Sequence, residues 1–243
     1  MKTNSLGKAF NRLFGASVIS NLSDGLLAVA APLLAITLTK DPILISMMSA
    51  LVMLPWLLFA IPIGLIVDRV DKRLLVTFTN SLRFLIAGLL SLAIATDVVT
   101  IYWLLLAAFL IGICEVASDT AAQSLIPVIL EKKNFEKANS RLNIAETVIQ
   151  NFVGAPLSGF LYATAIVLPF VLNSLGFLVA AIFVFLIPAH LISQGSAEVK
   201  KDVAKKSFIE DIKFGLSYLW NDRPLRRLVA TTSSLGFFYS LSM

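Results

Sequence analysis

Long apolar runs, each about as long as a membrane is thick, constrain this chain more than any other feature of its sequence. A helix that crosses the hydrocarbon core needs about 20 mostly apolar residues, and six such runs are separated here by short charged stretches. The composition agrees, because 58% of the 243 residues are apolar and 14% are charged, against about 45–50% and about 25% in a soluble domain. The sequence therefore predicts an all-α, polytopic membrane protein.

The positions of these runs define six predicted spans. They cover residues 13–38, 43–67, 74–96, 98–118, 140–163 and 168–189, with the fourth helix continuing to about residue 126. Between Leu142 and Ala189 the only charged residue is Glu146. So long a run exceeds one crossing, and we therefore place a hairpin at residues 164–169.

Basic residues are concentrated on one side of this topology. They occur before the first predicted span and after the second, fourth and sixth: Lys2, Lys8, Arg12, Arg69, Lys72, Arg73, Lys132, Lys133, Lys137, Arg141 and eight more between Lys200 and Arg227. The loops on the other side contain only Lys40. The positive-inside rule predicts that the N-terminus and the even-numbered loops are cytoplasmic. This topology accounts for the net charge of +5, so we expect no nucleic-acid partner.

The last part of the chain differs from the six spans. After a polar, Lys-rich stretch, apolar residues from Ile209 to Trp220 recur at helical spacing opposite charged residues, as in a helix that lies on a membrane surface. A further apolar run begins at Leu228, and the chain ends at Met243 before a full crossing. We therefore expect a six-span bundle in residues 1–190, a cytoplasmic linker with an interfacial helix in residues 191–227, and an incomplete seventh span in residues 228–243.

The loop between the second and third predicted spans carries the most specific motif. In "GLIVDRVDKR" the matching residues are Gly64, Asp68, Arg69, Lys72 and Arg73. They follow the pattern G-x-x-x-D-R-x-G-R-R/K, the cytoplasmic signature of the major facilitator superfamily, with an Asp in place of the central Gly. The chain thus resembles the N-terminal half of such a transporter. The resemblance implies a six-helix bundle made of two inverted repeats of three helices.

Two partial matches are similar to exporters of this superfamily. Gly154, Pro156 and Gly159 in "GAPLSGF" resemble the antiporter motif G-P-x-x-G-G, and "GICEVASDTAAQSLIP" resembles the end of the fourth span in the drug- and siderophore-exporting branch, which includes macrolide and enterobactin exporters. The resemblance implies that Asp68 and Arg69 latch the two halves of the transporter in its outward-open state. A plain topology anchor is the alternative for the loop, and close helix packing is the alternative for the second motif.

Four ionisable residues lie well inside the predicted spans: Asp24, Arg83, Glu115 and Glu146. At the rise of an α-helix they lie about 10–18 Å from the cytoplasmic ends of their spans. Each charge would cost about 2.5–3.5 kcal/mol if it faced lipid at this depth. We therefore expect all four to face protein or water, as candidates for substrate binding and proton coupling.

Polar residues accompany these charges at helical spacing. The stripes are Ser17, Ser20, Asn21 and Asp24 in the first span, Glu115, Ser118 and Asp119 in the fourth, and Asn143, Glu146, Thr147, Gln150 and Gly154 in the fifth. Three polar faces predict a shared wet cavity, where transporters of this kind bind substrate. Alternatively, the uncharged members only bond helix to helix, and Asp119 is only solvated near the cytoplasmic surface.

These charges lead to a functional hypothesis. Arg83 keeps its proton and needs a carboxylate partner, yet one Arg does not neutralise three acids, so at least one carboxyl is expected to carry a proton. We predict that Glu115 or Asp24 couples proton entry to export. The predicted function is proton-coupled secondary export of an amphiphilic or cationic small molecule, of the drug or siderophore class, across a bacterial cytoplasmic (inner) membrane.

The alternative comes from a different class of protein. Six spans form only half of a two-lobed pore. The alternative hypothesis is therefore a truncated, non-transporting half-transporter or a membrane interaction subunit. Its partner would be a missing C-terminal half or a second half-transporter chain.

An enzyme is not predicted. The chain shows no paired His, no Ser-His arrangement and no Gly-rich phosphate loop. Cys114 and His190 are each the only residue of their type, which argues against a disulfide or a metal site. We expect no cofactor.

Overall fold

The regular structure of the described chain is helical. The computed structural model describes residues 6–189, 217 and 220–241. The helices are α1 (Lys8–Leu38), α2 (Pro42–Arg69), α3 (Lys72–Ala95), α4 (Ile101–Ile129), the short 3-10 helix η1 (Lys132–Asn134), α5 (Phe135–Ile144), the π-helix η2 (Ala145–Gly154), α6 (Ala155–Thr164), α7 (Leu168–Phe185) and α10 (Arg223–Leu241). Five of them, α1 to α4 and α7, are long and apolar enough to cross a membrane. The predicted all-α, polytopic membrane fold is confirmed.

The fifth predicted span consists of three consecutive segments. The backbone stays helical where α5 meets η2, at Ala145 (φ −59°, ψ −47°), and where η2 meets α6, at Ala155 (φ −63°, ψ −49°). The N–H of Ala155 donates to the carbonyl of Gln150, in the longer register of a π-helix. We call this continuous helical path, residues 135–164, span five. The hairpin predicted after it is present between α6 and α7.

Identifiable sequence signals set the start of α3 and the end of α7. Asp71 accepts hydrogen bonds from the backbone N–H groups of Arg73 (2.9 Å) and Leu74 (3.1 Å), and therefore caps the N-terminus of α3. Its φ of −68° and ψ of 111° are ordinary extended values. The Asp that replaces the central Gly of the loop motif thus needs no left-handed backbone. Helix α7 ends at Phe185 rather than at the predicted residue 189. The reason is Pro188, because a proline disfavours helical backbone angles at the residue before it.

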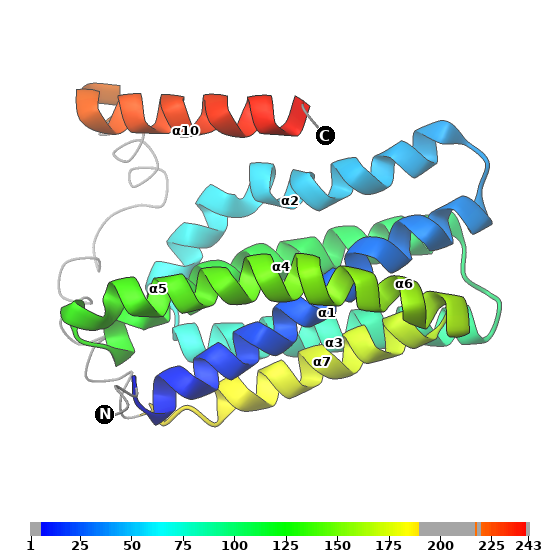
Figure 1. Ribbon diagram of the computed structural model, residues 1–243, viewed down its shortest axis with the longest axis horizontal. Helices are drawn as coiled ribbons and strands as arrows, with labels where there is room; N and C mark the ends of the chain where they lie inside the picture. The colour runs from blue at the N-terminus through cyan, green and yellow to red at the C-terminus, as the bar shows by residue number, and fades with distance from the viewer. Residues whose placement is uncertain (1–5, 190–216, 218–219, 242–243) are drawn as a thin grey trace. The chain divides into compact units, whose positions relative to one another are not determined.

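The packing of residues 8–185 follows an internal symmetry (Figure 1). The main contacts join α3 to α7, α1 to α7, α2 to α4, α3 to α4, and α1 to span five. If α1, α2 and α3 are exchanged with α4, span five and α7, each contact is converted into another contact of the same set. The paired helices run in opposite directions, which is the arrangement of an inverted repeat of three helices.

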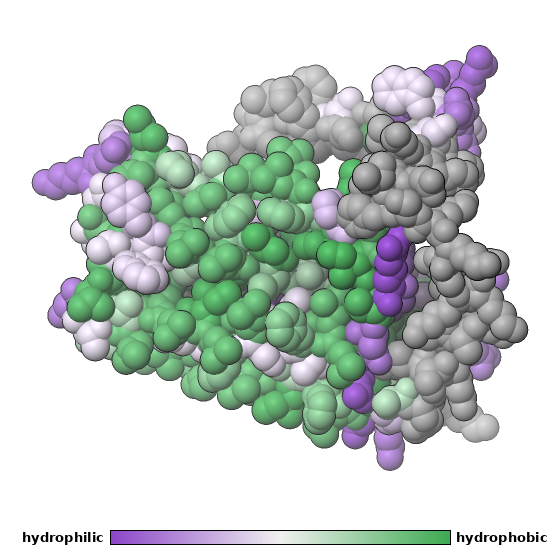
Figure 2. Space-filling model, turned by 180° about the vertical axis from the view of Figure 1, so that it is seen from behind, coloured by the Kyte–Doolittle hydropathy of each residue, from purple (hydrophilic) through white to green (hydrophobic). Residues whose placement is uncertain are grey.

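Charged residues mark the two ends of this bundle. The start of α1, the α2–α3 and α4–α5 connections and the end of α7 lie together at the left in Figure 1, and we call this the basic end. It carries Lys8, Arg12, Arg69, Lys72, Arg73, Lys132, Lys133, Lys137 and Arg141. The opposite end, with Lys40, Asp41 and Asp97, is the far end. Between them the surface is mainly hydrophobic (Figure 2), as a lipid-facing surface must be.

The two largest apolar clusters of the described core lie toward opposite ends of the bundle. One lies toward the basic end and includes Leu13, Val67, Leu125 and Val184; the other lies toward the far end and includes Ala30, Leu34, Met48, Leu104 and Phe170. The polar residues of α1, α3 and α4 lie between these clusters along the helices. The functional site is built in this intermediate layer.

Residues 200–243 form a separate compact unit. Within it, Asp222 accepts a hydrogen bond from the N–H of Leu225 (3.2 Å) at the start of α10. The predicted interfacial helix lies outside the described residues apart from Ser217 and Trp220, and so does His190. Helix α10 already begins at Arg223, ahead of the apolar run that we predicted from Leu228.

Candidate functional site

A buried guanidinium group is the centre of the site. Arg83 of α3 is fully buried, and its Nη2 donates to Oδ1 of Asp24 on α1. Its Nη1 donates to Oγ of Ser20 at 3.1 Å, and Nη2 lies 3.8 Å from Oε2 of Glu115 on α4. Cζ of Arg83 lies 3.9 Å from the ring centroid of Phe177 on α7. We call these five residues the central cluster.

The central cluster compensates the charges that it buries. A carboxylate, a hydroxyl and an aromatic face surround the guanidinium, which offsets much of the cost of removing it from water. The two carboxylates are not equivalent, because 9% of the Asp24 side chain is exposed and 25% of the Glu115 side chain. Asp24 is held in direct contact with Arg83, whereas Glu115 is farther away and open to a cavity.

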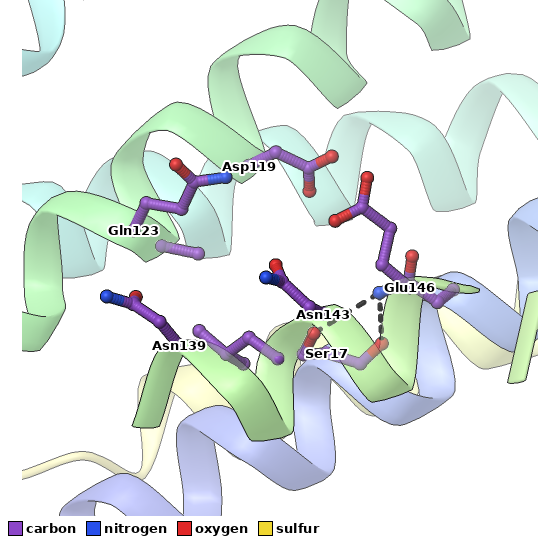
Figure 3. Close-up of a pocket in the computed structure, with 9 residues that line it drawn as sticks. Ser17, Asp119, Gln123, Asn139, Asn143 and Glu146 are labelled. Atoms are coloured by element: carbon purple, nitrogen blue, oxygen red, sulfur yellow. Dashed lines mark hydrogen bonds between the residues drawn. The ribbon is translucent and has the colours of Figure 1, made fainter. Parts of the chain in front are cut away.

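A polar cavity lies on the basic-end side of the central cluster. It has a volume of about 350 Å³ and is lined by Ser17, Asn21, Asp119, Ala122, Gln123, Asn139, Leu142, Asn143 and Glu146. The residues come from α1, α4, α5 and η2. Figure 3 shows the carboxyl groups of Asp119 and Glu146 turned toward one another across this cavity. It is a hollow lined by carboxylates, amides and a hydroxyl, and no basic side chain is among its lining residues.

An apolar cavity lies on the far-end side of the cluster. Its volume is about 320 Å³, and its lining comes from α1, α2, α4 and η2: Asp24, Leu27, Ala28, Ala31, Pro32, Met48, Ser49, Val52, Met53, Ala108, Ile111, Gly112, Glu115 and Gln150. Aliphatic and methionine side chains dominate this wall. Asp24 and Glu115 supply its charged groups, so this cavity combines an apolar surface with an acidic floor.

Near the boundary between the two cavities, α1 and span five cross closely. A Cβ on Gly25 would lie 2.3 Å from the carbonyl oxygen of Gln150 and 2.9 Å from Cα of Gly154. A Cβ on Gly154 would lie 2.9 Å from Cα of Gly25. Only glycine allows two backbones to approach this closely. Along α1 the crossing falls between Asn21 of the polar cavity and Ala28 of the apolar cavity.

The structure divides the predicted ionisable residues between two places. Asp24, Arg83 and Glu115 meet in the central cluster. Glu146 lies instead in the polar cavity, together with Asp119. Glu146 lies nearer the basic end of span five, while Gln150, one turn further along the same helix, lines the apolar cavity.

The two motifs are also placed by the structure. Asp68 and Arg69 are exposed at the basic end, and Gly64 is half-buried. Arg73 points elsewhere, because its Nη1 donates to the carbonyl of Ile187 (2.6 Å) at the end of α7. In span five, Gly154 is at the crossing with α1, whereas a Cβ on Gly159 would meet nothing within 4 Å.

Sequence reasoning missed two asparagines and an aromatic ring in this layer. Asn80 donates to Oγ of Ser118 (3.0 Å), and Asn173 donates to the carbonyl of Ser23 (2.7 Å). Phe177 covers the guanidinium. Asn80 lies one turn before Arg83 on the same face of α3, and this spacing was a usable signal. Nothing in the sequence distinguished Phe177 from the other 16 phenylalanines, of 17 in total.

Apolar helices around two internal cavities and a buried ionic cluster define a multi-pass membrane transport protein. The family model of the Major Facilitator Superfamily matches residues 13–243. The chain belongs to this superfamily of secondary transporters, as its loop motif suggested. No curated protein and no solved structure matches the chain. Within the described residues, no three His, Cys, Asp or Glu side chains are placed to hold a metal ion.

Proposed function

We propose that this transporter exports an amphiphilic or cationic small molecule, of the drug or siderophore class, in exchange for protons. The observation that carries the proposal is the charge of the site. Four carboxyl groups, those of Asp24, Glu115, Asp119 and Glu146, line the two cavities, and their lining residues include no basic side chain. Arg83, behind the cavities, is the counter-ion of one of them. A hollow with this excess of acid attracts cations.

The lining of the apolar cavity supports an amphiphilic substrate. Ligand sites are typically apolar hollows with a few placed polar groups, and a wall of Met48, Val52 and Met53 over the Glu115 carboxyl has this composition. The apolar part of a substrate would contact the methionines, whose flexible side chains adapt to varied shapes. Its cationic group would pair with Glu115.

Glu115 is the proposed coupling residue. It lines the apolar cavity and lies 3.8 Å from Nη2 of Arg83, so its carboxylate has two competing partners, the guanidinium and a bound cation. A proton on Glu115 removes the charge that attracts the cation. Protonation and substrate binding therefore exclude one another at this residue, which is the requirement for exchange. Asp24 is in direct contact with Arg83 and positions the guanidinium beside Glu115.

The basic end is proposed to face the cytoplasm of a bacterium, in the inner membrane, with the N-terminus inside. The support is the unequal distribution of Lys and Arg between the two ends of the bundle. Asp68 and Arg69 are exposed there, as a latch to another part of the transporter requires. Gly154, Pro156 and Gly159 are proposed to shape span five for exchange, since Gly154 sets the crossing near the boundary between the cavities.

Transport of a radiolabelled tetraphenylphosphonium cation and of a ferric siderophore in proteoliposomes with an imposed pH gradient tests this proposal. We expect the gradient to drive transport of at least one of these probes by the unmodified chain, and Glu115→Gln and Asp24→Asn each to abolish it. Glu131→Gln is the matched control, because Glu131 pairs with Lys133 on the surface (2.6 Å), where 74% of each side chain is exposed. Gradient-driven transport that persists in both cavity variants would refute the coupling role.

A second candidate is a half-transporter that pairs with another helical bundle. It is favoured by α2, which lines the apolar cavity although only 17% of its most apolar window is buried, against 39–56% in α1, α3, α4 and α7. Leu57 on this helix is 81% exposed. A second bundle, whether a C-terminal half that begins with the seventh span predicted in residues 228–243 or another copy of the chain, would cover α2 and close the cavity.

Disulfide cross-linking distinguishes the two candidates. With Cys114 replaced by Ala, a Leu57→Cys variant in native membranes should cross-link to a second copy if copies pair through α2. A cross-link would support the half-transporter. Monomers alone, together with gradient-driven transport, would favour the exporter formed by one chain.

A further inference from the structure

A small internal cavity connects the polar cavity with the central cluster. Its volume is about 20 Å³, and it lies between α1, α3, α4 and α7. Its lining residues are Leu13, Ala16, Ser17, Ser20, Asn21, Val76, Asn80, Ser118, Asp119, Ala122 and Val184. Four of these residues, Ser17, Asn21, Asp119 and Ala122, also line the polar cavity. Another, Ser20, accepts a hydrogen bond from Arg83. The volume is sufficient for one water molecule.

One polar atom in the wall of this small cavity lacks a hydrogen-bond partner. Asn80 is 1% exposed, and its Nδ2 donates to the carbonyl of Val76 (2.9 Å) and to Oγ of Ser118 (3.0 Å). A backbone carbonyl can only accept, so the amide atom that contacts Val76 is the NH2, and this contact fixes the orientation of the amide. The Oδ1 atom is left buried and unpaired. A buried acceptor without a partner is costly, and ordered water is the usual partner in such a place.

We propose that the small cavity binds a single water molecule, held by Asn80 Oδ1, and that this water carries protons between Asp119 and the central cluster. The water donates one hydrogen to Asn80 Oδ1. Its other hydrogen and its lone pairs face the polar groups of the same wall, the Asp119 carboxyl and the hydroxyls of Ser20 and Ser118. These groups satisfy the two to four polar contacts that a buried water needs.

In this proposal, the polar groups on either side of the water carry the proton. Asp119 lines both the polar cavity and the small cavity, so it can take a proton from the solvent of the first and present it to the second. Ser20 lies one helical turn before Asp24 on the same face of α1, and both accept from Arg83. A proton that leaves Asp119 passes to the water, the water passes one of its own to the Ser20 hydroxyl, and that hydroxyl passes its own to the Asp24 carboxylate.

The charges around this path control its direction. Asp119 and, across the polar cavity, Glu146 attract protons at the entrance. Arg83 opposes a free hydronium ion at the inner end, so a proton moves there only onto a carboxylate, Asp24 or, beyond Arg83, Glu115. The water site depends on geometry alone, whereas its role as a relay rests on the proposed proton coupling.

Radiolytic footprinting tests the water site directly. Hydroxyl radicals formed from an ordered internal water modify the side chains beside it, so brief X-ray exposure of the purified chain should oxidise Leu13, Val76 and Val184, which line the small cavity. Leu34 and Leu104, equally buried in the far-end cluster, are the internal controls and should remain unmodified. Equal, background labelling at all five residues would refute the water site.

Two substitutions of one residue test the relay. Ala16 lines the small cavity but neither large one. Ala16→Val fills the space with methyl groups, whereas Ala16→Ser fills it with a hydroxyl that can replace the water as partner of Asn80. Both should abolish the footprint at Val76. Ala9→Val, on the same helix and beside the same core cluster, is the volume-matched control and should keep it.

The functional measurement is the rate of proton release when tetraphenylphosphonium is mixed with the chain in weakly buffered detergent solution. Positioned proton donors and acceptors typically contribute 10²–10⁴-fold to a rate, so we expect release to be about 100-fold slower in Ala16→Val. Ala16→Ser and Ala9→Val should release protons at close to the unmodified rate.

The outcomes separate the two proposals. If the unmodified chain shows the footprint and Ala16→Val is the only variant that releases protons slowly, the relay is supported. If the unmodified chain shows the footprint but Ala16→Val releases protons at the unmodified rate, the water site is supported and the relay is refuted. If the unmodified chain binds the cation without releasing protons, the proposed proton coupling fails and the relay with it, while the footprint still decides the water site.

Discussion

The polar cavity and the apolar cavity have similar volumes, about 350 and 320 Å³, but opposite chemistry. The first is lined by acids, amides and a serine near the basic end. The second is lined mainly by aliphatic and methionine side chains nearer the far end, with acids only at its floor. Both use α1, α4 and span five, so the difference does not come from the helices themselves. It comes from which stretch of each helix faces the hollow.

This difference indicates where the barrier between the two cavities lies. The central cluster lies between the cavities and is an electrostatic barrier, and the Gly25–Gly154 crossing near their boundary is a steric one. The polar lining suits water and ions, whereas the apolar lining suits hydrocarbon groups. A layer of buried charge between them keeps the two environments distinct, and Glu115 is the group that faces the apolar side from this layer.

Removing Arg83 should have the largest effect, because Arg83 is the centre of the charged layer between the two cavities. Arg83→Met leaves the 9% exposed Asp24 without its counter-ion, and breaking a buried ion pair from one side typically costs about 3–5 kcal/mol. We expect a loss of this size in the free energy of unfolding, measured by tryptophan fluorescence during titration of the detergent-solubilised chain with dodecyl sulfate.

A double variant is the control for this result. Replacing a whole buried pair by apolar residues is often neutral, so Arg83→Met combined with Asp24→Leu should recover most of the lost stability. If the single variant were as stable as the unmodified chain, the central cluster would not be what holds α1 and α3 together.

The length and polarity of the spans could be predicted from the sequence, because bilayer thickness and backbone hydrogen bonding leave few alternatives. The hairpin after Thr164 followed from the same argument, since the apolar run is too long for one crossing. The need of Arg83 for a carboxylate followed from the chemistry of guanidinium in a membrane.

The division of the acids between two cavities did not follow. Glu146 lines the polar cavity and Glu115 lines the apolar cavity. Which hollow a side chain reaches depends on the rotation of its helix about its axis as well as on its depth. Rotation depends on packing against several neighbours at once, such as the close contact at Gly25 and the π-helical register of residues 145–154. Neither is encoded in a local pattern, so hydropathy placed the residues along the membrane normal but not around the helices.

Thiol labelling measures the difference in polarity between the two cavities. In a chain with Cys114 replaced by Ala, we expect a neutral, hydrophilic methanethiosulfonate to react faster at Asn143→Cys in the polar cavity than at Ala108→Cys in the apolar cavity. Moving a polar group from water into an apolar hollow without a hydrogen-bond partner costs about 1–3 kcal/mol, which corresponds to a rate ratio of roughly 10 to 100. Mass spectrometry of timed samples measures both rates. Equal rates would show that the polar reagent enters both cavities alike.

The helix crossing near the boundary between the cavities gives the next effect. Gly25→Ala places a methyl group within 2.3 Å of a backbone carbonyl, and such overpacking costs about 1–3 kcal/mol. Because α1 and span five must then move apart, labelling at Ala108→Cys should also rise. Gly159→Ala is the matched control, since its Cβ meets nothing within 4 Å. A Gly25→Ala variant as stable as Gly159→Ala would contradict the close approach.

The smallest effect is expected from Asp71, which is remote from both cavities. Asp71→Ala removes the side chain that caps α3 and should cost about 1 kcal/mol, whereas Asp71→Gly, the residue of the superfamily motif, should cost only about a few tenths. Denaturation in dodecyl sulfate measures both. The labelling rates at Asn143→Cys and Ala108→Cys should stay the same in each variant, because α3 contributes no lining residue to either large cavity. If uncapping α3 changed their ratio, the contrast between the cavities would depend on the position of α3, and so of Arg83, rather than on the residues that line them.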